Sequence, residues 1–319
     1  MGIQGLNLFL SKQIPEINNT VCLTRFSNKK VGIDTSIYLY KFKYNHRNFI
    51  EGFVKQIYRL KINNITPIYI FDGKPPKEKT HIIQLRKKKR NVLLIQLKQL
   101  ERTKERCKTL FEIVIINTKI ENLKKKMIKI TPEDIELLKR CLSLCGVMFI
   151  QSESESDFLF GSLYKHNYID MAISEDNDII VNNNTILIKY INIYSNNVRI
   201  YDKTVILKKL GLTNKQWIHF CILLGCDYFK RISYSTEMIY HFIKTYHIDD
   251  LLTNVISLDE KRIRSFKKSE TIFTTLPAIK QTHISRTQID IRGLHQFITQ
   301  NTVIPEKSVR KIIGVISSN

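Results

Sequence analysis

The chain has 319 residues, 43% of them hydrophobic and 25% charged, so it is long enough to bury one large core or two smaller ones. Its 51 Lys and Arg residues against 29 Asp and Glu residues give a net charge of +22, which favours a polyanionic partner, either nucleic acid or an anionic membrane surface. We expect a soluble intracellular protein, because no apolar run reaches the roughly 18 residues of a membrane span and residues 1–16 show no signal peptide.

Short strand-like runs, rich in Val, Ile and aromatic residues, alternate with helical patterns up to about residue 174. The predicted strands are 29–34 (KKVGID), 66–72 (TPIYIFD), 146–150 (GVMFI) and 169–174 (IDMAIS). The predicted helices are 49–62, 132–145 and 155–165, the second of which opens with Thr131 as N-cap and Pro132 at its first position. This alternation predicts an α/β fold in which helices cover both faces of a parallel sheet.

Residues 74–130 interrupt this alternation with eighteen Lys and Arg residues and only five Glu residues, a net charge of +13. The segment has no Gly and, after Pro76, no Pro, so we expect one or two long amphipathic helices. A charge run is commonly only the solvated face of a helix, but here the acids are too few to neutralise the bases by i,i+4 pairing. We therefore predict an inserted helical segment that binds a polyanion.

The six cysteines include no Cys-x-x-Cys pair. Cys141 and Cys145 stand four residues apart in a helical pattern, and no His lies nearby at ligand spacing. We therefore expect buried, reduced thiols rather than a zinc site.

Seven acidic residues follow predicted strands or, in one case, an apolar helix. They are Asp34, Asp72, Glu153, Glu155, Asp176, Asp178 and Asp227. Parallel strands share one carboxyl edge, and open α/β sheets place their sites in the crevice beyond it. Asp176 and Asp178 are expected to share a face of an extended segment. Glu153 and Glu155 both point into the crevice if they stand at the start of a helix, where the helix dipole favours acids.

Carboxylates that crowd together repel one another and raise their own pKa values, so such a cluster persists where divalent cations neutralise it. Carboxylate oxygens suit hard ions such as Mg²⁺ or Mn²⁺. Two such ions about 3.5–4 Å apart clamp the attacking and leaving oxygens of a phosphodiester displacement. Each acid alone is more often a helix cap or a solvated turn. The position of all seven together predicts a two-cation site that meets a nucleic-acid phosphate.

The same residues lie in motifs that resemble the flap endonuclease branch of the XPG-type structure-specific 5′ nucleases. The motifs are MGIQGL, VGIDTSIYLYKF, PIYIFDGKPPKEK, SESESDF, SEDNDIIV, CILLGCDYF and LHQFITQNTVIPEKSVRKII. They keep the family's order and extend over nearly the whole chain. The resemblance implies a PIN-like α/β sheet, an inserted basic helical arch, and a C-terminal helical region similar to a helix–two-turn–helix motif.

The resemblance divides one compact catalytic core into three regions. Residues 1–105 are expected to form an N-terminal nuclease region with the arch at about 74–130, residues 132–225 an internal nuclease region, and residues 226–319 a helical DNA-binding region. It also implies a monomer without membrane contact, located in the nucleus, or in a cytoplasmic viral factory if the chain is viral.

A metal-binding role is implied for each of the seven acids by the resemblance. Two Mg²⁺ ions, for which Mn²⁺ can substitute, would be held by two ligand sets, mainly Asp34, Asp72, Glu153 and Glu155 for one ion and mainly Asp176, Asp178 and Asp227 for the other.

DNA-facing roles follow from the resemblance as well. Lys79 and Arg86, seven positions apart on one helix face, match a basic pair that orients the scissile phosphate and stabilises its developing charge. Tyr40 matches an aromatic residue on which a terminal base stacks. Arg47 matches a DNA-contacting position, and Gly2 matches the approach of the N-terminus to the DNA.

Three features depart from the family pattern. The segment between Asp72 and Glu153 is several residues longer than usual, so the geometry of the arch differs. The stretch KRISYSTEMIYHF after Asp227 lacks the glycines of the turn that grips a duplex with a potassium ion, which predicts weaker or altered duplex binding. Ser233, Ser235 and Thr236 still offer hydroxyl groups there. The chain also carries no clamp-binding box at its C-terminal end, which argues against recruitment by a sliding clamp.

The sequence therefore predicts a metal-dependent flap endonuclease and 5′–3′ exonuclease, which hydrolyses DNA phosphodiester bonds at or near 5′-flap junctions by a two-metal-ion mechanism. Its expected substrate is branched or 5′-flap DNA in replication, repair or recombination. Two alternatives are a catalytically silent DNA-junction scaffold and a PIN-like ribonuclease. The presence of all seven acids argues against the first, and the basic arch with the MGIQGL start argues against the second.

Overall fold

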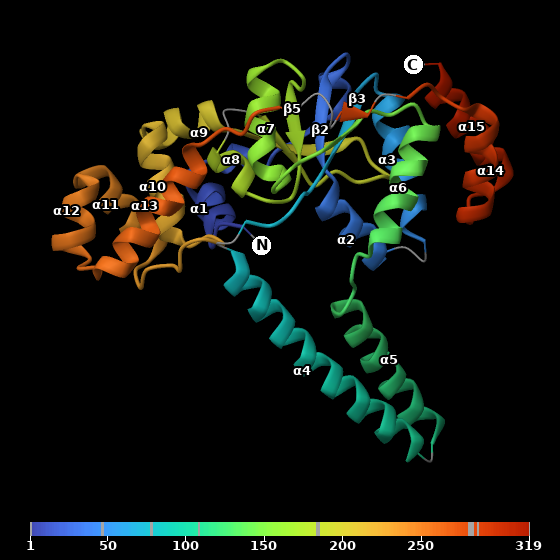
Figure 1. Ribbon diagram of the computed structural model, residues 1–319, viewed down its shortest axis with the longest axis horizontal. Coiled ribbons are helices and arrows are strands. Elements are labelled where there is room, and N and C mark those ends of the chain that lie inside the picture. Colours follow the sequence, from blue (N-terminus) through green and yellow to red (C-terminus); the bar gives the residue numbers. More distant parts are fainter. Residues whose placement is uncertain are drawn as a thin grey trace.

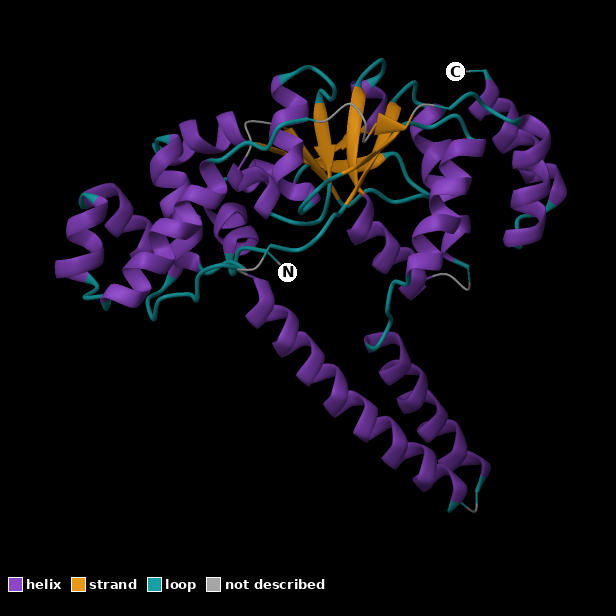
Figure 2. Ribbon diagram, viewed as in Figure 1, coloured by secondary structure: helices purple, strands orange, loops and turns teal. Residues whose placement is uncertain are grey.

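A computed structural model describes residues 2–45, 48–76, 79–107, 109–182, 186–279, 284–285 and 287–318. A central sheet lies between two groups of helices, and a pair of long helices projects below the sheet (Figure 1, Figure 2). Within the described ranges, no helix combines the length and the apolar character that crossing a membrane requires.

The described residues contain a mixed sheet with the strand order β1-β7-β6-β5-β2-β3-β4-β8. Its strands are β1 (Thr20–Cys22), β2 (Lys30–Asp34), β3 (Thr66–Phe71), β4 (Phe149–Gln151), β5 (Met171–Ile173), β6 (Ile186–Lys189), β7 (Asn197–Asp202) and β8 (Ile284–Ser285). The strands from β6 to β4 run parallel, as predicted, whereas β1, β7 and β8 pair antiparallel at the edges. Residues 190–196 between β6 and β7 are too few for the crossover that parallel neighbours need.

The central strands are buried on both faces, because helices cover both sides of the sheet. Neighbouring residues of β3 alternate between two hydrophobic cores. Ile68 and Ile70 belong to one core, and Tyr69 and Phe71 belong to the other. The sheet therefore separates the molecule into two packed layers and leaves its carboxyl edge open.

The helices account for most of the chain. They are α1 (Leu6–Gln13), α2 (Thr35–Asn45), α3 (Phe49–Lys61), α4 (Thr80–Glu105), α5 (Leu110–Lys126), α6 (Pro132–Leu144), α7 (Ser156–Lys165), α8 (Asp178–Asn182), α9 (Lys203–Leu210), α10 (Asn214–Leu224), α11 (Thr236–Thr245), α12 (Ile248–Asp250), α13 (Glu260–Thr274), α14 (Ile291–Asn301) and α15 (Glu306–Ser317). Short 3₁₀ or π turns are η1 (Pro15–Asn18), η2 (Leu23–Phe26) and η4 (Leu251–Val255).

Side chains of α1, α7, α8, α10, α11 and α13 fill the core on one face of the sheet, and side chains of α2, α3, α6, α14 and α15 fill the core on the other. Two of the predicted helices begin at capping residues, whereas Glu155 at the start of α7 forms no side-chain cap. Asn48 accepts a hydrogen bond from the backbone N–H of Ile50 at the start of α3. Thr131 and Asp134 form a capping box at α6, with Pro132 at the first position.

The predicted basic segment forms two helices, α4 and α5, which pack along each other and project from the body as an arch (Figure 1). Helix α5 begins after Thr109, which forms a capping box with Glu112. Most side chains described on the two helices are solvent-exposed, and Ile116 and Ile120 are the buried residues of α5. The arch therefore owes little of its stability to a core, and its basic side chains stay available to a partner.

Two predicted strands begin at least two residues later than expected, and one of them is β5, which begins at Met171 instead of residue 169. The pattern places a strand at 146–150, but β4 begins at Phe149. The preceding residues complete the end of α6 instead, because Gly146 takes a left-handed φ of 63° and the N–H of Val147 donates to the carbonyl of Leu142.

The cysteines are free thiols, as predicted, although they are not all buried. Cys141, Cys145 and Cys221 are buried, whereas Cys22 is exposed. Burial raises the pKa of the Cys221 thiol well above its usual value, so this thiol stays protonated.

Candidate active site

A cavity of about 780 Å³ lies between the carboxyl edge of the sheet and the arch. Five of the seven predicted acids line it: Asp34, Asp72, Glu155, Asp176 and Asp227. Asp178 adjoins it, since one of its carboxylate oxygens lies within 4.8 Å of an oxygen of Asp176. Glu153 does not line this cavity. It is exposed and lines a separate, more apolar cavity of about 240 Å³ beside Ile150 and Phe158.

Asp34 and Asp72 are held by hydrogen bonds from neighbouring elements. Asp34 is the last residue of β2, and its Oδ2 accepts a 2.7 Å hydrogen bond from the hydroxyl of Ser174, which follows β5. Asp72 directly follows β3, and its Oδ1 accepts a 2.8 Å hydrogen bond from the backbone N–H of Ser156 at the start of α7. These bonds fix one oxygen of each carboxylate and aim the strand ends at the cavity.

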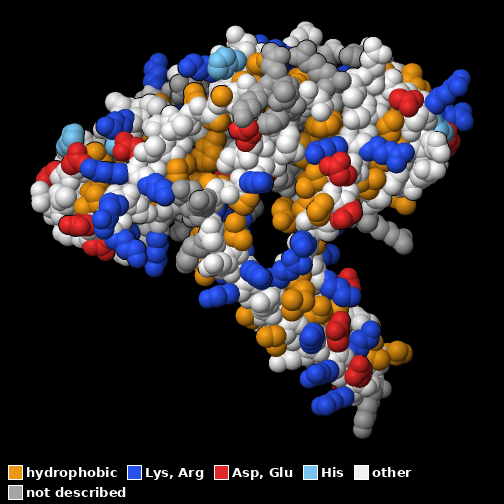
Figure 3. All heavy atoms as spheres, in the orientation of Figure 1, with side chains coloured by type: hydrophobic (Ala, Val, Ile, Leu, Met, Phe, Trp, Pro, Cys, Tyr) orange, Lys and Arg blue, Asp and Glu red, His pale blue; other side chains and the backbone are white. Residues whose placement is uncertain are grey.

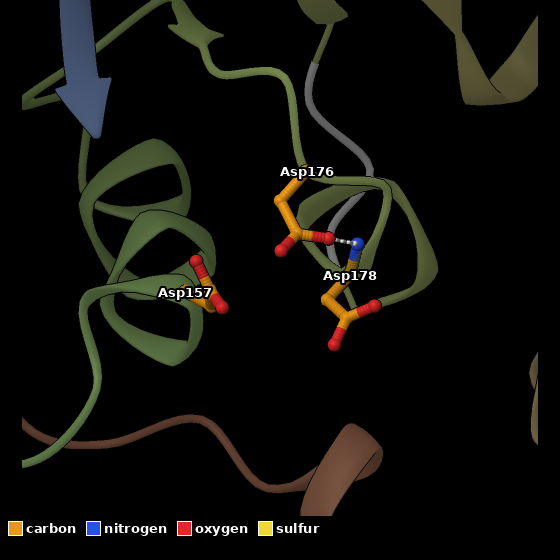
Figure 4. A group of neighbouring side chains, drawn as sticks. All are labelled: Asp157, Asp176 and Asp178. Atoms are coloured by element: carbon orange, nitrogen blue, oxygen red, sulfur yellow. Dashed lines mark hydrogen bonds between the residues drawn. The ribbon is translucent and has the colours of Figure 1, made fainter. Parts of the chain in front are cut away.

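The predicted pairing of Asp176 and Asp178 on one face of an extended segment is wrong in its geometry, because Asp178 is the first residue of α8. The backbone N–H of Asp178 instead donates a 3.1 Å hydrogen bond to Oδ1 of Asp176, and the N–H of Asp176 donates to the hydroxyl of Ser174 at 3.0 Å. Both carboxylates nevertheless face the same space, opposite Asp157 on α7 (Figure 4).

Three acids in and beside this cavity, Asp34, Asp157 and Asp178, resist ionisation. Burial, together with the charges of Asp72 and Asp176, raises the pKa of Asp34 to about 7, although the hydroxyl of Ser174 acts against the rise. Burial and the neighbouring acids also raise the pKa values of Asp157 and Asp178 well above their usual range. A positive ligand that neutralised the cluster would therefore stabilise its charged form.

The cavity fits a hard divalent cation on two grounds. Its donors are carboxylate oxygens, the ligands that Mg²⁺ and Mn²⁺ prefer. In addition, Oδ1 of Asp178 is buried and has no hydrogen-bond partner among the residues that the structure describes. A buried, unsatisfied carboxylate oxygen is costly, and a cation would satisfy it.

Lys79 and Arg86 both reach the acids. Lys79 Nζ lies 2.7 Å from Oε2 of Glu155 and 2.9 Å from Oδ2 of Asp227, and Arg86 Nη2 lies 3.5 Å from the same oxygen of Asp227. Burial alone would lower the pKa of Lys79, but the two carboxylates outweigh it and raise this pKa above its usual value. The two bases therefore bring positive charge from the start of α4 into the acidic cavity.

Tyr228 was not predicted as a site residue, although it stands next to Asp227. Its hydroxyl donates a 2.6 Å hydrogen bond to Oε2 of Glu155, and its ring centroid lies 5.1 Å from Nζ of Lys79. Its ring also packs edge-on against Phe273 of α13. The sequence signal was the position beside Asp227, but the contact to Glu155 depends on the tertiary fold.

Asp157 is a second residue that the prediction missed. It lines the cavity, and one of its carboxylate oxygens lies within 4.8 Å of oxygens from Asp176 and Asp178. The available signal was the spacing within SESESDF, where Asp157 lies two positions after Glu155 and thus falls in the first turn of α7.

Two of the three residues predicted to contact DNA lie at or beside the cavity. Tyr40, with 47% of its side chain exposed, lines the cavity from α2. Gly2 has a φ of 86°, and a Cβ added to it would lie 2.3 Å from Oδ1 of Asp176, so the N-terminal segment passes directly beside the acids. Arg47 lies outside the described residues.

Basic side chains from both arch helices complete the rim of the cavity. They are Arg86, Lys87, Lys89 and Arg90 of α4 and Lys126 of α5. Figure 3 shows an opening between the arch and the body with Lys and Arg side chains around it. The arrangement combines acids at the bottom of the cavity with bases at its entrance.

The turn after Asp227 uses its hydroxyl groups internally. Ser235 caps α11 by accepting a 3.1 Å hydrogen bond from the N–H of Met238. Thr236 Oγ1 accepts a 3.1 Å hydrogen bond from Arg231, which also donates to the carbonyl of Gln4. Two of the three predicted phosphate-facing hydroxyls thus already have protein partners.

The chain matches two family models, the XPG N-terminal domain over residues 1–92 and the XPG I-region over residues 146–227. Flap endonuclease 1 of Babesia bovis is 26% identical over 333 residues, an alignment that covers 98% of this chain and 47% of the relative. Flap endonuclease 1 of Saccharomyces cerevisiae strain RM11-1a is 28% identical over 252 residues, covering 73% and 62%. The chain thus spans about half to three-fifths of the length of these relatives.

Solved structures share the fold. The catalytic core of Rad2 in complex with a DNA substrate aligns with a TM-score of 0.72 at 20% identity, covering 99% of this chain and 100% of the other. Flap endonuclease-1 from Methanococcus jannaschii aligns with a TM-score of 0.68 at 20% identity, covering 94% and 95%. Since the two matched family models together span more than half of the 319 residues and lie on the strands that carry the acids, the chain belongs to the XPG-type flap endonuclease family.

Proposed function

We propose that the chain is a metal-dependent nuclease that hydrolyses DNA phosphodiester bonds at or near the junction of a 5′ flap with a duplex. The observation that carries the proposal is the meeting of the acidic cavity with Lys79 and Arg86 beneath a basic arch. A scissile phosphate needs counter-charge on both sides, and this cavity offers cation ligands on one side and fixed bases on the other. The similar flap endonucleases and the DNA-bound Rad2 core support the same substrate class.

Two cations would be held by the carboxylates of the cavity, one mainly by Asp34, Asp72 and Glu155 and the other mainly by Asp176, Asp178 and Asp227. Glu153 belongs to the first set by family resemblance, but its place in the neighbouring cavity makes it at most an indirect ligand. When bound, such cations supply Lewis-acid activation of water and neutralise phosphate charge. Mg²⁺ is the proposed ion, with Mn²⁺ as its substitute.

The protein's own groups orient the substrate. Lys79, held between Glu155 and Asp227, would fix the scissile phosphate from inside the cavity. Arg86 is 54% exposed and would contact the same phosphate from the side of the solvent. Tyr40 would stack on the terminal base of the unpaired strand, a contact that tolerates any sequence. The basic rim of the arch would hold the flap backbone by charge.

The remaining features of the proposal concern the whole protein. The catalytic core would consist of the three regions 1–105, 132–225 and 226–319, the last of which binds duplex DNA. We propose that it works as a monomer on chromosomal or viral DNA in replication, repair or recombination, in the nucleus or in a cytoplasmic viral factory.

A panel of labelled DNA substrates tests the proposal. With Mg²⁺, a 5′-flap duplex should be cut near its junction and leave a 5′-phosphate, whereas blunt duplex and 3′-flap DNA should be cut far more slowly. Asp176→Ala and Asp227→Ala should abolish cutting while DNA binding persists. The same flap made of RNA serves as the comparison, and faster cleavage of RNA than of DNA would overturn the proposed substrate. Binding without cleavage in both Mg²⁺ and Mn²⁺ would overturn the enzyme assignment.

A further inference from the structure

We propose that Asp157 is a cation ligand, and that it joins Asp176 and Asp178 in holding the second of the two divalent cations proposed above. The inference rests on the proposed function in its choice of ligand, a hard divalent ion such as Mg²⁺ or Mn²⁺. It changes the composition of the site, since the sequence prediction does not include Asp157 among the metal ligands, although this residue lies within the SESESDF motif.

The three carboxylates converge from two separate elements. Asp157 projects from the first turn of α7, Asp178 begins α8, and Asp176 lies two residues before Asp178 (Figure 4). One oxygen of each lies within 4.8 Å of one oxygen of both others. Two oxygens bound to one ion at about 2.0–2.6 Å lie at most about 4–5 Å apart, so small side-chain rotations would let the three share a cation.

A second observation points to a ligand at this place. Asp178 is 5% exposed, and its Oδ1 is buried without a hydrogen-bond partner within the described part of the chain. Its backbone N–H is bonded to Asp176, so the carboxylate is held in position while one of its oxygens stays unsatisfied. A buried acceptor of this kind is strongly destabilising unless a cation, a donor or a proton satisfies it.

The carboxylates around the cavity differ in whether a basic side chain forms an ion pair with them. Glu155 and Asp227 form ion pairs with Lys79, and Asp227 also with Arg86. By contrast, Asp176 and Asp178 form no ion pair with a Lys or Arg residue of the described ranges. A cation arriving from solution would therefore compete directly with Lys79 for the oxygens of Glu155 and Asp227, whereas Lys79 influences Asp178 only through its charge at longer range.

The position of Glu153 completes the argument. Backbone contacts hold the 152–154 segment against the chain that follows β3, because Gly73 N–H donates to the carbonyl of Ser154 at 2.6 Å and Lys74 N–H donates to that of Glu153 at 3.1 Å. Glu153 then faces the neighbouring cavity, and the carboxylate that α7 supplies near Asp176 and Asp178 is that of Asp157.

Mn²⁺ binding to the full chain tests the assignment without relying on activity. Electron paramagnetic resonance of free Mn²⁺ would be titrated for the wild type, Asp157→Asn, and the matched exposed control Asp249→Asn on α12. We expect tight binding by the wild type and the control, and at least about tenfold weaker binding by Asp157→Asn. Wild-type affinity in Asp157→Asn, or no Mn²⁺ binding by the wild type, would overturn the inference.

Thermal unfolding adds a second test, because a purely structural role of Asp157 would not make the effect of Asp157→Asn on the melting temperature depend on cations. Without cations, Asp157→Asn should melt above the wild type, because the substitution removes like-charge repulsion. With Mn²⁺, the wild type should gain more stability than the variant, so the order reverses or the gap closes. Crystals of the wild type soaked in Mn²⁺ need no variant. They should show an anomalous peak between the three carboxylates, and a peak elsewhere in the cavity alone would contradict the site.

Flap cleavage separates this inference from the proposed function. If the wild type cuts flap DNA but Asp157→Asn binds Mn²⁺ normally, the nuclease assignment stands and the Asp157 site is wrong. If Mn²⁺ binds at Asp157 but no DNA or RNA flap is cut, the cation site stands and the nuclease assignment is wrong.

Discussion

The hydroxyl of Tyr228 donates a 2.6 Å hydrogen bond to Oε2 of Glu155, the same oxygen that Lys79 contacts at 2.7 Å. Burial and the charge of Glu155 raise the pKa of Tyr228 above its usual value, so its hydroxyl remains a donor at any physiological pH. The phenol thereby holds Glu155 and Lys79 in one arrangement at the floor of the cavity.

Tyr228→Phe should lower the rate of single-turnover flap cleavage by about 5- to 50-fold, the effect of losing a hydrogen bond to a charged group. The ring and its contact with Phe273 remain, so the melting temperature should change little. Tyr164→Phe, an exposed tyrosine of α7, is the matched control. Equal cleavage rates for Tyr228→Phe and the wild type would show that Glu155 needs no such support.

Lys79→Met and Lys87→Met should separate catalysis from binding. Lys79 is buried and contacts two carboxylates, so its loss should lower turnover by about 10²–10³-fold with a small change in the Kd for flap DNA. Lys87 lies on the exposed rim, so its loss should mainly weaken binding and reduce the dependence of that binding on salt. Single-turnover rates and fluorescence anisotropy at several salt concentrations measure the two effects. The opposite pattern would contradict the assigned positions of the two lysines.

Tyr40→Ala should slow cleavage of a 5′ flap by about 10- to 100-fold, and Tyr40→Phe should restore most of the rate, because stacking needs only the aromatic face. The expectation rests on the exposed position of Tyr40 on the cavity wall. Fluorescence of a 2-aminopurine base at the junction would report the stacking directly. If Phe failed to rescue, the hydroxyl rather than the ring would be the functional group.

Lys203 should make stability depend on pH above about 8. This buried lysine donates a 2.8 Å hydrogen bond to the carbonyl of Val181, and burial lowers its pKa to about 8 from 10.5. Between these values the unfolded chain binds more protons than the folded one, so this group makes stability rise with pH. Relative to Lys203→Met, the wild type should gain about 2 kcal/mol in unfolding free energy from pH 8 to 10.

Urea unfolding at both pH values measures this difference, with the exposed Lys208→Met as the matched control. A stability difference between the wild type and Lys203→Met that stays constant over this range would show that Lys203 keeps an ordinary pKa in the folded protein.

Much of the site can be predicted from the sequence, because the direction of the strands decides where their terminal acids lie. Asp34 and Asp72 end apolar runs that read as neighbouring parallel strands, so their convergence requires only the α/β fold. The family motifs then add Lys79 and Arg86, whose contacts with Asp227 no periodicity predicts.

The sequence does not predict which of the two acids, Glu153 or Asp157, faces the acidic cavity. It depends on where α7 begins and on the backbone contacts that Gly73 makes with the 152–154 segment. A Cβ on Gly73 would lie 2.3 Å from the carbonyl oxygen of Ser152, which shows how closely the two segments approach. Two acids four positions apart are equivalent in the sequence, and it is the start of α7 together with this tertiary contact that places one outside the cavity and the other inside it. The edge strands β1 and β8 were missed for a different reason, since they are too short to show a pattern.

The closeness of Gly2 to Asp176 has a practical consequence for making the protein. An affinity tag fused ahead of Gly2 would start its path beside the acids and obstruct both ion loading and substrate entry. The opposite terminus follows α15 on the far side of the molecule, away from the arch (Figure 1). An affinity tag should therefore be fused after residue 319. A tag at the other end must be cleaved so that no foreign residue remains in front of Gly2.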